Sequence, residues 1–598
     1  MKKTLKQMLA LVLALVLTLS MAACGTTESD PTTGKTEPPA GTSAPDTSPP
    51  PTEFDPLSVT KGVTLTVAVP MNITVEDWET NATTLAIQEA LGVELEFEVY
   101  ASADYTEKLN VMINGGDKLP DIILGYQGSG AESISAFVTD WGINGALADL
   151  TEYITDPVYT PNIHAVMEAE NDYFLDRAKD AEGNIWYFPT YIADPYNGTP
   201  YNLMINKDFV EKLGKTMPTN TDEFLELARA FKAAGDVNGN GEDDEVFLTG
   251  RGDNMRWFNC LMSSFIYAWG DNYLVEEDGK LTFAYTTDEW KEGLKWLNTF
   301  FEEGLIDTGA LTNDKNAYNA ILQAETARVM CDVYYYAAIT GKDTVDQINQ
   351  RISYQKPILL TSPVNSDPRG HYDPADPVAT AVVTADCQNV EAAVIVLDYM
   401  CNEELSLSSG TGWRGIHWDY AEDFDASKFT DEADRSRKAE DYISTDPARY
   451  EEPLYITYGS IWGTSEQQNW IYMGIGPRLY SQKLYYGGGV YKAPNMEPTA
   501  EANFAFTEWK NNQTAASMEI IPDNIVTEAQ LKMTAEELDE LADIKTTLKN
   551  YVTESIGAFL TGQWDVEADW AGYIAELEKI GVSKALELYQ TAYERTVG

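Results

Sequence analysis

An oxygen-rich loop at residues 236–245 carries the clearest candidates for chemistry in this chain of 598 residues. Its sequence, DVNGNGEDDE, places an aspartate and two asparagines at alternate positions, followed at once by a glycine. Alternate oxygen side chains point toward a common centre, and glycine allows the turn that brings the next backbone carbonyl inward. A full EF-hand loop ends in a glutamate where this chain has Phe247, so Glu245 is expected to supply that carboxylate. We expect a structural Ca²⁺ ion, held by Asp236, Asn238, Asn240, Glu242, Asp244 and Glu245.

The loop could also be an ordinary solvated acidic turn, because the chain has 95 acidic against 41 basic residues. Its formal charge of −54 disfavours nucleic acids and anionic lipid surfaces as partners, but leaves room for a local basic pocket. A glycosidase needs a pair of carboxylates at its active site. A chain with this many acidic residues always contains such pairs, so their presence is no evidence for a glycosidase. No Ser-His-Asp arrangement, phosphate-binding loop or HExxH motif is visible. The few histidines and widely spaced cysteines indicate neither a zinc site nor a disulfide framework.

The N-terminus predicts export and a lipid anchor. Basic residues precede an apolar run at residues 9–19, which is too short for a membrane span of roughly 20 residues and indicates a signal peptide at 1–23. The sequence Met-Ala-Ala-Cys resembles a bacterial lipobox, which implies a lipid on Cys24 at the extracellular face of the cytoplasmic membrane. A cleaved signal peptide with a chance cysteine is the alternative. Residues 24–60 are rich in Ser, Thr and Pro, and we expect them to form a disordered tether.

Beyond the tether, strands alternate with helices, which predicts an α/β fold. Alternating apolar residues predict strands over 63–70 and 93–100, and 121–124 has the pattern of a buried strand. Amphipathic patterns predict helices over 83–91 and 105–113. This β-α-β-α-β order predicts a doubly wound sheet with ligands at the carboxyl ends of its strands.

Helix signals are strong before the oxygen-rich loop and at the end of the chain. Asn220 with Glu223 predicts a capping box. The apolar stripe of that helix consists of Phe224, Leu227, Ala228 and Phe231. Long helices are predicted over 536–562 and 570–595, and helices of this kind normally cover the face of a sheet.

Six motifs follow one another along residues 61–480: NGGDKLPDIIL (114–124), GALADL (145–150), GNIWYFPTY (183–191), YNLMINKDFVEKLGKTMPTNTDEFLELARAF (201–231), VATAVVTADCQNVEAAVIVLDYMCNEE (378–404) and GTGWRGIHWDY (410–420). Each is short, but the collinear series resembles that of extracellular solute-binding proteins of bacterial ABC importers. The match is to the branch of large sugar- and oligosaccharide-binding lipoproteins. The 236–245 loop is also similar to the calcium loop of alginate- and oligosaccharide-binding members.

The resemblance implies a two-lobed, periplasmic-binding-protein-like α/β fold with chain crossovers between the lobes and a helical C-terminal extension. The N-terminal lobe is expected to use residues 61–190 plus 365–425, and the C-terminal lobe 191–364 plus 426–598. The implied function is that of a monomeric receptor. It would capture an oligosaccharide by hinge closure and deliver it to the membrane permease subunits of an ABC importer. A surface-anchored glycosidase or lyase, and a receptor for peptides or other small solutes, are the alternatives.

Sugar receptors combine aromatic rings, which pack against apolar C–H faces, with polar side chains that bind hydroxyl groups. Several aromatic residues of this chain lie in predicted loops, although core packing explains any one of them equally well. Trp257 and Trp413 are the preferred stacking residues. The complete set of candidates for ligand binding is Trp186, Tyr187, Asn202, Trp257, Trp413, Arg414, Trp418, Trp462 and Glu466.

Overall fold

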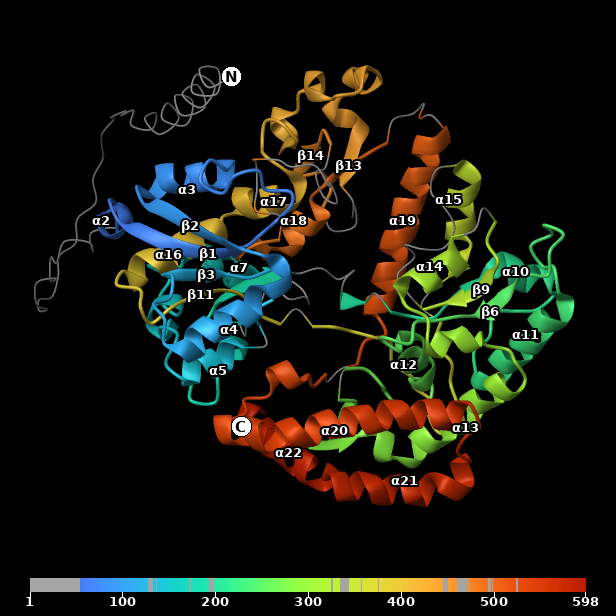
Figure 1. Cartoon of the computed structure of the whole chain (residues 1–598). Coiled ribbons are helices and arrows are strands. Elements are labelled where there is room, and N and C mark those ends of the chain that lie inside the picture. Colours follow the sequence, from blue (N-terminus) through green and yellow to red (C-terminus); the bar gives the residue numbers. More distant parts are fainter. Residues whose placement is uncertain are drawn as a thin grey trace, which may run out of the picture. The chain divides into compact units, whose positions relative to one another are not determined.

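Two β-sheets organise the chain in the computed structural model (Figure 1). Among the described residues, the first sheet has six strands in the order β15-β4-β11-β3-β1-β2, and the second has four in the order β10-β5-β9-β6. The predicted α/β fold class is confirmed. The structure describes residues 54–597 apart from 127–132, 136, 171–173, 193–197, 200, 271, 324–325, 334–343, 356–357, 375, 445–449, 460–468, 470–471, 473, 493–495, 497 and 523–524.

The first sheet contains the predicted β-α-β-α-β unit. Its strands are β1 (Thr64–Pro70), β2 (Glu94–Tyr100), β3 (Ile122–Leu124), β4 (Phe188–Ile192), β11 (Val378–Val383) and β15 (Leu479–Tyr480). Strand β1 pairs in parallel with β2 and β3, whereas β11 is antiparallel to both β3 and β4. The two-residue β15 pairs in parallel with β4, although it comes from the stretch predicted for the C-terminal lobe. That stretch therefore contributes to the first sheet, and the other lobe boundaries stay a prediction.

Short helices accompany the first sheet, and the two predicted ones are confirmed. They are α2 (Leu57–Thr60), α3 (Ala82–Leu91), α4 (Tyr105–Gly115), α5 (Val138–Ile143), α6 (Thr151–Ile154), α7 (Pro161–Glu170), α8 (Phe174–Ala178) and α16 (Val390–Met400). Helix α16 is apolar on most sides because it packs against β11, α3, α6 and α7 together. Its buried Asp398 accepts the backbone N–H groups of Asn162 and Ile163, both at 3.1 Å, and so holds the first turn of α7.

The second sheet is surrounded by longer helices and contains the larger aromatic core. Its strands are β5 (Met204–Asn206), β6 (Val246–Leu248), β9 (Val329–Asp332) and β10 (Tyr354–Gln355). Strand β5 is antiparallel to β9 and β10, and β6 is parallel to β9. The helices are α10 (Lys207–Lys212), α11 (Thr221–Ala234), α12 (Arg256–Met262), α13 (Asp288–Glu302), α14 (Lys315–Leu322), α15 (Val345–Ile352) and α19 (Pro498–Met518).

Helix α11 shows how local sequence sets an element here. All four residues of its predicted apolar stripe are buried. Asn220 Oδ1 accepts the backbone N–H of Glu223 at 2.9 Å, as an N-cap should. The return half of the predicted capping box is wrong, because the Glu223 carboxylate accepts the N–H and the hydroxyl of Thr219 instead.

The C-terminal helices α20 (Ala535–Leu560), α21 (Val566–Ile580) and α22 (Val582–Val597) pack side by side (Figure 1). The single helix predicted over 570–595 is in fact two, because the chain turns at Gly581 in the left-handed conformation. The expectation that these helices cover a sheet face is also corrected in part. Helix α20 packs on α13 and so extends a helical layer, whereas α22 does pack on a small sheet, the hairpin of β7 (Leu274–Glu277) and β8 (Lys280–Phe283).

A smaller group of elements follows α16. It consists of α17 (Glu403–Thr411), α18 (Gln482–Tyr486) and two strand pairs, β12 (Trp418–Tyr420) with β14 (Tyr455–Thr457) and β13 (Tyr442–Ser444) with β16 (Gly489–Tyr491). Across the described parts of the chain, no helix has both the length and the apolar character that a membrane crossing requires.

Candidate functional site

The chain passes from the first sheet to the second between β4 and β5 and returns between β10 and β11. Residues from both crossings meet around one arginine. Tyr201 lies on the first crossing and His371 on the second, while Arg256 begins α12 and Trp269 lies in the loop between α12 and β7. These four residues are termed the Arg256 cluster.

The Arg256 cluster is held by stacked rings and a cation. The guanidinium carbon of Arg256 lies 4.6 Å from the ring centroid of Tyr201 and 5.9 Å from that of Trp269. The Tyr201 and Trp269 rings are nearly parallel, with centroids 6.0 Å apart, and the imidazole of His371 lies 4.3 Å from Trp269. A guanidinium over aromatic faces gains roughly 0.5–2 kcal/mol, so these contacts fix its position.

Two donors in the cluster are buried with no hydrogen-bond partner among the described residues. They are Nε of Arg256 and Nε1 of Trp269. A buried donor without a partner costs about 1–3 kcal/mol, which a ligand oxygen could recover. Donors beside aromatic faces suit a ligand that has both hydroxyl oxygens and apolar C–H faces.

Asp373 adds an acceptor beside these donors. Its Oδ1 lies 3.2 Å from Nε2 of His371, and its side chain is 59% exposed. Desolvation, the largest single influence, raises the pKa of Asp373. The hydrogen bond to His371 and the positive charges of His371 and Arg256 lower it, and together they outweigh the desolvation. The pKa therefore stays below its ordinary value, and the group is a carboxylate at neutral pH.

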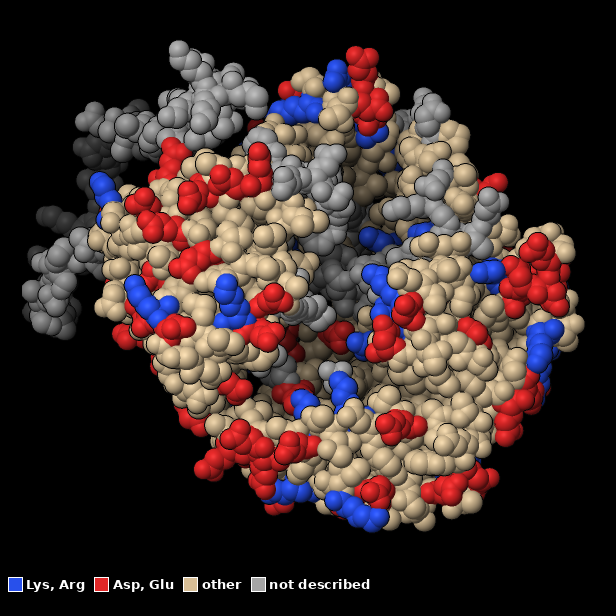
Figure 2. Space-filling model, viewed as in Figure 1, with Lys and Arg blue, Asp and Glu red and all other residues tan. Residues whose placement is uncertain are grey.

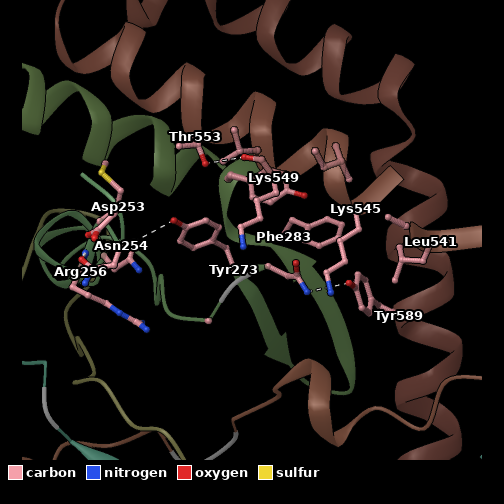
Figure 3. A pocket seen from close by; sticks show the side chains of 18 residues that line it. Asp253, Asn254, Arg256, Tyr273, Phe283, Leu541, Lys545, Lys549, Thr553 and Tyr589 are labelled. Atoms are coloured by element: carbon pink, nitrogen blue, oxygen red, sulfur yellow. Dashed lines mark hydrogen bonds between the residues drawn. The ribbon is translucent and has the colours of Figure 1, made fainter. Parts of the chain in front are cut away.

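A pocket of about 200 Å³ adjoins Arg256 (Figure 3). Its walls come from the turn before α12, from the β7–β8 hairpin and from helices α20 and α22. Tyr273, Phe283 and Tyr285 line it with aromatic rings, and Lys545 and Lys549 reach toward it from α20. The hydroxyl of Tyr273 donates to Oδ1 of the buried Asn259 at 3.2 Å.

The prediction of Trp257 as a stacking residue is wrong. Its side chain is 1% exposed, and its Nε1 donates to the carbonyl of Ala310 at 3.1 Å. Its indole fills the space above Gly250, where a Cβ atom would lie 2.0 Å from the ring. Successive residues of a helix point about 100° apart, so Arg256 joins the cluster while Trp257 turns into the core.

Residues 412–418 (GWRGIHW) belong to the group of elements around β12. Their described contacts are with that group and not with the Arg256 cluster. Trp418 is fully buried and donates to the carbonyl of Gly412 at 2.7 Å, so it offers no face to a ligand. Arg414 pairs with Glu404 at 2.9 Å and Asp423 at 2.8 Å, which occupies its donors within the protein. Trp413 is half-buried and stays a candidate for ligand stacking.

The three candidates near the first crossing have different surroundings. Trp186 is half-buried, and its Nε1 donates to Asp180 at 2.7 Å. Tyr187 packs, like Trp186, against the buried core of the first sheet. Its burial raises the pKa of its hydroxyl, and the negative charge of Asp376 adds a smaller increase. Asn202 is buried in a small cavity together with Trp269 and His371, so the structure brings it beside the Arg256 cluster.

The oxygen-rich loop joins α11 to β6, as the prediction of a helix–strand junction requires. The Asp236 carboxylate accepts the N–H groups of Gly239, Asn240 and Gly241 at 2.7–3.0 Å, and Glu245 Oε1 accepts that of Asn238 at 2.8 Å. The second oxygen of Glu245 is buried with no partner in the described structure. This orphaned oxygen, in a loop of oxygen donors, fits a hard cation such as Ca²⁺.

Asp244 differs from its predicted role as a metal ligand, because its Oδ2 pairs with Arg328 at 2.9 Å. Among the described residues, no group of three or more Asp, Glu, His or Cys side chains lies close enough together to hold a metal ion. The remaining predicted residues, Trp462, Glu466 and Cys24, lie outside the described residues.

Sequence reasoning missed Tyr201, Trp269 and His371, which stand far apart in the chain. Arg256 directly precedes the predicted Trp257, and Tyr201 directly precedes the predicted Asn202. Those two neighbours were the only signals, because the cluster forms through tertiary packing.

The chain is similar in sequence to a known protein family and to one of its characterised members. A sequence model described as bacterial extracellular solute-binding protein matches residues 77–405. The fructooligosaccharide ABC transporter substrate-binding protein FusA of Streptococcus pneumoniae is 28% identical over 536 residues, which cover 85% of this chain and 86% of that protein.

Solved structures show the same fold. The structure of FusA with kestose matches with a TM-score of 0.62 and 23% identity over 89% of this chain and 99% of that one. A FusA EF-hand mutant with fructo-nystose matches with a TM-score of 0.61 at 22% identity, again over 89% of this chain and 99% of that one. An extracellular solute-binding protein from Bifidobacterium longum subsp. infantis gives a TM-score of 0.67 at 17% identity, covering 90% of this chain and all of that one. The two-lobed, periplasmic-binding-protein-like fold is confirmed.

Proposed function

The chain belongs to the bacterial extracellular solute-binding proteins, and on that premise we propose that it binds an oligosaccharide and delivers it to an ABC importer. The observation that carries the proposal is the Arg256 cluster, in which two parallel rings and two buried donors without partners lie at the chain crossings. The similarity to FusA over most of both chains supports the same class of solute.

The chemistry of the cluster suits a sugar. The half-buried ring of Tyr201 would pack against C–H faces, and Trp269, which is 4% exposed, would support that ring from behind. Arg256 and Asp373 would bind hydroxyl oxygens as donor and acceptor. Asn202, Trp186, Tyr187 and Trp413 complete the proposed contacts. The chain crosses a third time between β16 and α19, which packs on α15. Ligand that binds the closed state better would shift the population toward closure, with these three crossings acting as the hinge.

The end of the predicted tether is corrected, because Leu57–Thr60 form helix α2, which packs on α16. Lipid attachment at Cys24 and a tether that ends before α2 would keep this receptor near the permease subunits on the extracellular face of the membrane. We also propose that the 236–245 loop binds Ca²⁺ as a structural ion. The oxygen donors of Asp236, Asn238, Asn240, Glu242 and Glu245 support this assignment, and the buried Glu245 oxygen would gain a partner. The ion would stabilise the junction of α11 and β6.

A thermal-shift screen against neutral and acidic oligosaccharides, followed by chromatography of each mixture, tests the proposed function. Stabilisation without new products is expected for a receptor. Release of shorter saccharides would instead indicate a glycosidase or lyase. Stabilisation by peptides alone would make the protein a peptide receptor.

A further inference from the structure

The pocket beside Arg256 gathers cations in a strongly acidic protein. Arg256 borders it on one side and Lys545 and Lys549 on the other, and Figure 3 shows the two lysines descending from α20. Lys545 pairs with Glu528 at 2.5 Å. Within the described part of the chain, neither Arg256 nor Lys549 forms an ion pair. The charge of Lys549 is therefore available to a ligand, and that of Arg256 is offset in part by the nearby carboxylate of Asp373.

The surrounding surface makes this concentration of positive charge unusual. Acidic residues outnumber basic ones by 95 to 41, and Figure 2 shows Asp and Glu in patches scattered over the visible face, with fewer Lys and Arg among them. Asp253, which also lines the pocket, pairs with Arg251 at 2.6 Å, so its charge is offset. The pocket is thus a local positive site in a negative field, which favours an anion inside it.

Backbone strain is also concentrated at this pocket. Among the described residues, three that are not glycine have positive φ, and two of them, Met255 at 50° and Tyr273 at 52°, line the pocket. The third, Asp278, lies in the tight turn between β7 and β8, where such a conformation is ordinary. A left-handed conformation costs roughly 1–3 kcal/mol at such residues and concentrates at binding sites.

We propose that this pocket binds one glycosyl residue bearing an anionic group, foremost a carboxylate, so that the solute is an acidic oligosaccharide. Arg256 and Lys549 would hold the anion, while Tyr273, Phe283 and Tyr285 would contact the sugar ring. The volume of about 200 Å³ lies below the roughly 300–1,000 Å³ of pockets for larger ligands, so it suits a single residue. This inference rests on the proposed function and specifies its substrate class.

Carboxyl reduction supplies a matched test, because it converts each uronate into the neutral sugar on the same backbone. The probes are oligogalacturonides, alginate oligouronates and neutral fructo- and galacto-oligosaccharides, each measured by calorimetry at low salt. We expect at least one acidic preparation to bind, and its reduced form to bind about tenfold more weakly. Lys549→Gln should remove most of that difference without loss of folding, because Lys549 is exposed.

Lys579→Gln is the control, because it makes the same charge change on α21, where Lys579 pairs with Glu576 away from the pocket. Acetate and inorganic phosphate separate a sugar acid from an anion alone. Binding of either as strongly as the acidic sugar would overturn the assignment. Equal affinity for an acidic saccharide and its reduced form, or binding of neutral saccharides only, would overturn the inference and leave the proposed function standing. Absence of binding to every saccharide would overturn the proposed function itself.

Discussion

The guanidinium of Arg256 lies over the ring of Tyr201, 4.6 Å from its centroid, although the two residues belong to different segments of the chain. Tyr201 lies on the crossing between the two sheets, and Arg256 is the first residue of α12. The contact therefore couples a crossing segment to the second sheet's helices at the proposed site.

Arg256→Lys should weaken oligosaccharide binding about tenfold while leaving the melting temperature nearly unchanged. Lysine keeps the charge but lacks the planar guanidinium and its Nε donor. Calorimetry with the saccharide found in the screen measures the effect. Arg229→Lys, at an exposed ion pair with Glu303 outside the pocket, should bind as the unaltered protein does. Full affinity of Arg256→Lys would exclude the cluster from the site.

Chelation of Ca²⁺ should lower the melting temperature at matched ionic strength, since the ion would bind only the folded loop. Glu245→Gln should abolish this dependence by neutralising the buried carboxylate that lacks a second partner. Glu242→Gln should retain it, because position 242 would contribute only its backbone carbonyl. Identical melting curves with and without chelator would show that the loop needs no ion.

Trp257→Ala should cost about 3–5 kcal/mol of unfolding free energy, because it empties a fully packed position in the core. Trp413→Ala should cost less than about 1 kcal/mol in denaturant titrations, because its side chain is half-buried. If Trp413 stacks on the ligand, its truncation should weaken binding by more than about 1 kcal/mol. The reverse pattern in the two unfolding curves would contradict the core position of Trp257.

Stability should fall as pH rises through the titration of Asp398. Burial raises the pKa of Asp398 to about 6 against the hydrogen bonds from Asn162 and Ile163, so the folded state prefers the neutral acid. Its stabilising contribution is present below about pH 4 and is lost as pH rises through 6. At roughly 1.4 kcal/mol per pKa unit, the protein should lose about 3 kcal/mol relative to Asp398→Asn between pH 4 and 7. Parallel stability curves for the two proteins would contradict the raised pKa.

The sequence by itself determined the elements whose signals are local. The strands β1 and β2, the stripe of α11 and the loop at 236–245 follow from patterns within a dozen residues, and the structure has each of them. The collinear motifs predicted the family. Such patterns suffice because secondary structure depends on burial periodicity and on hydrogen bonds between near neighbours.

Only the tertiary structure decided which side chains meet. Trp257 and Arg256 are adjacent in sequence, yet one fills the core and the other stacks on Tyr201. Asp244 matches a metal-ligand position, yet it pairs with Arg328, and β15 joins a sheet that its place in the chain did not indicate. These contacts join residues from distant segments, and they depend on packing that no local spacing encodes.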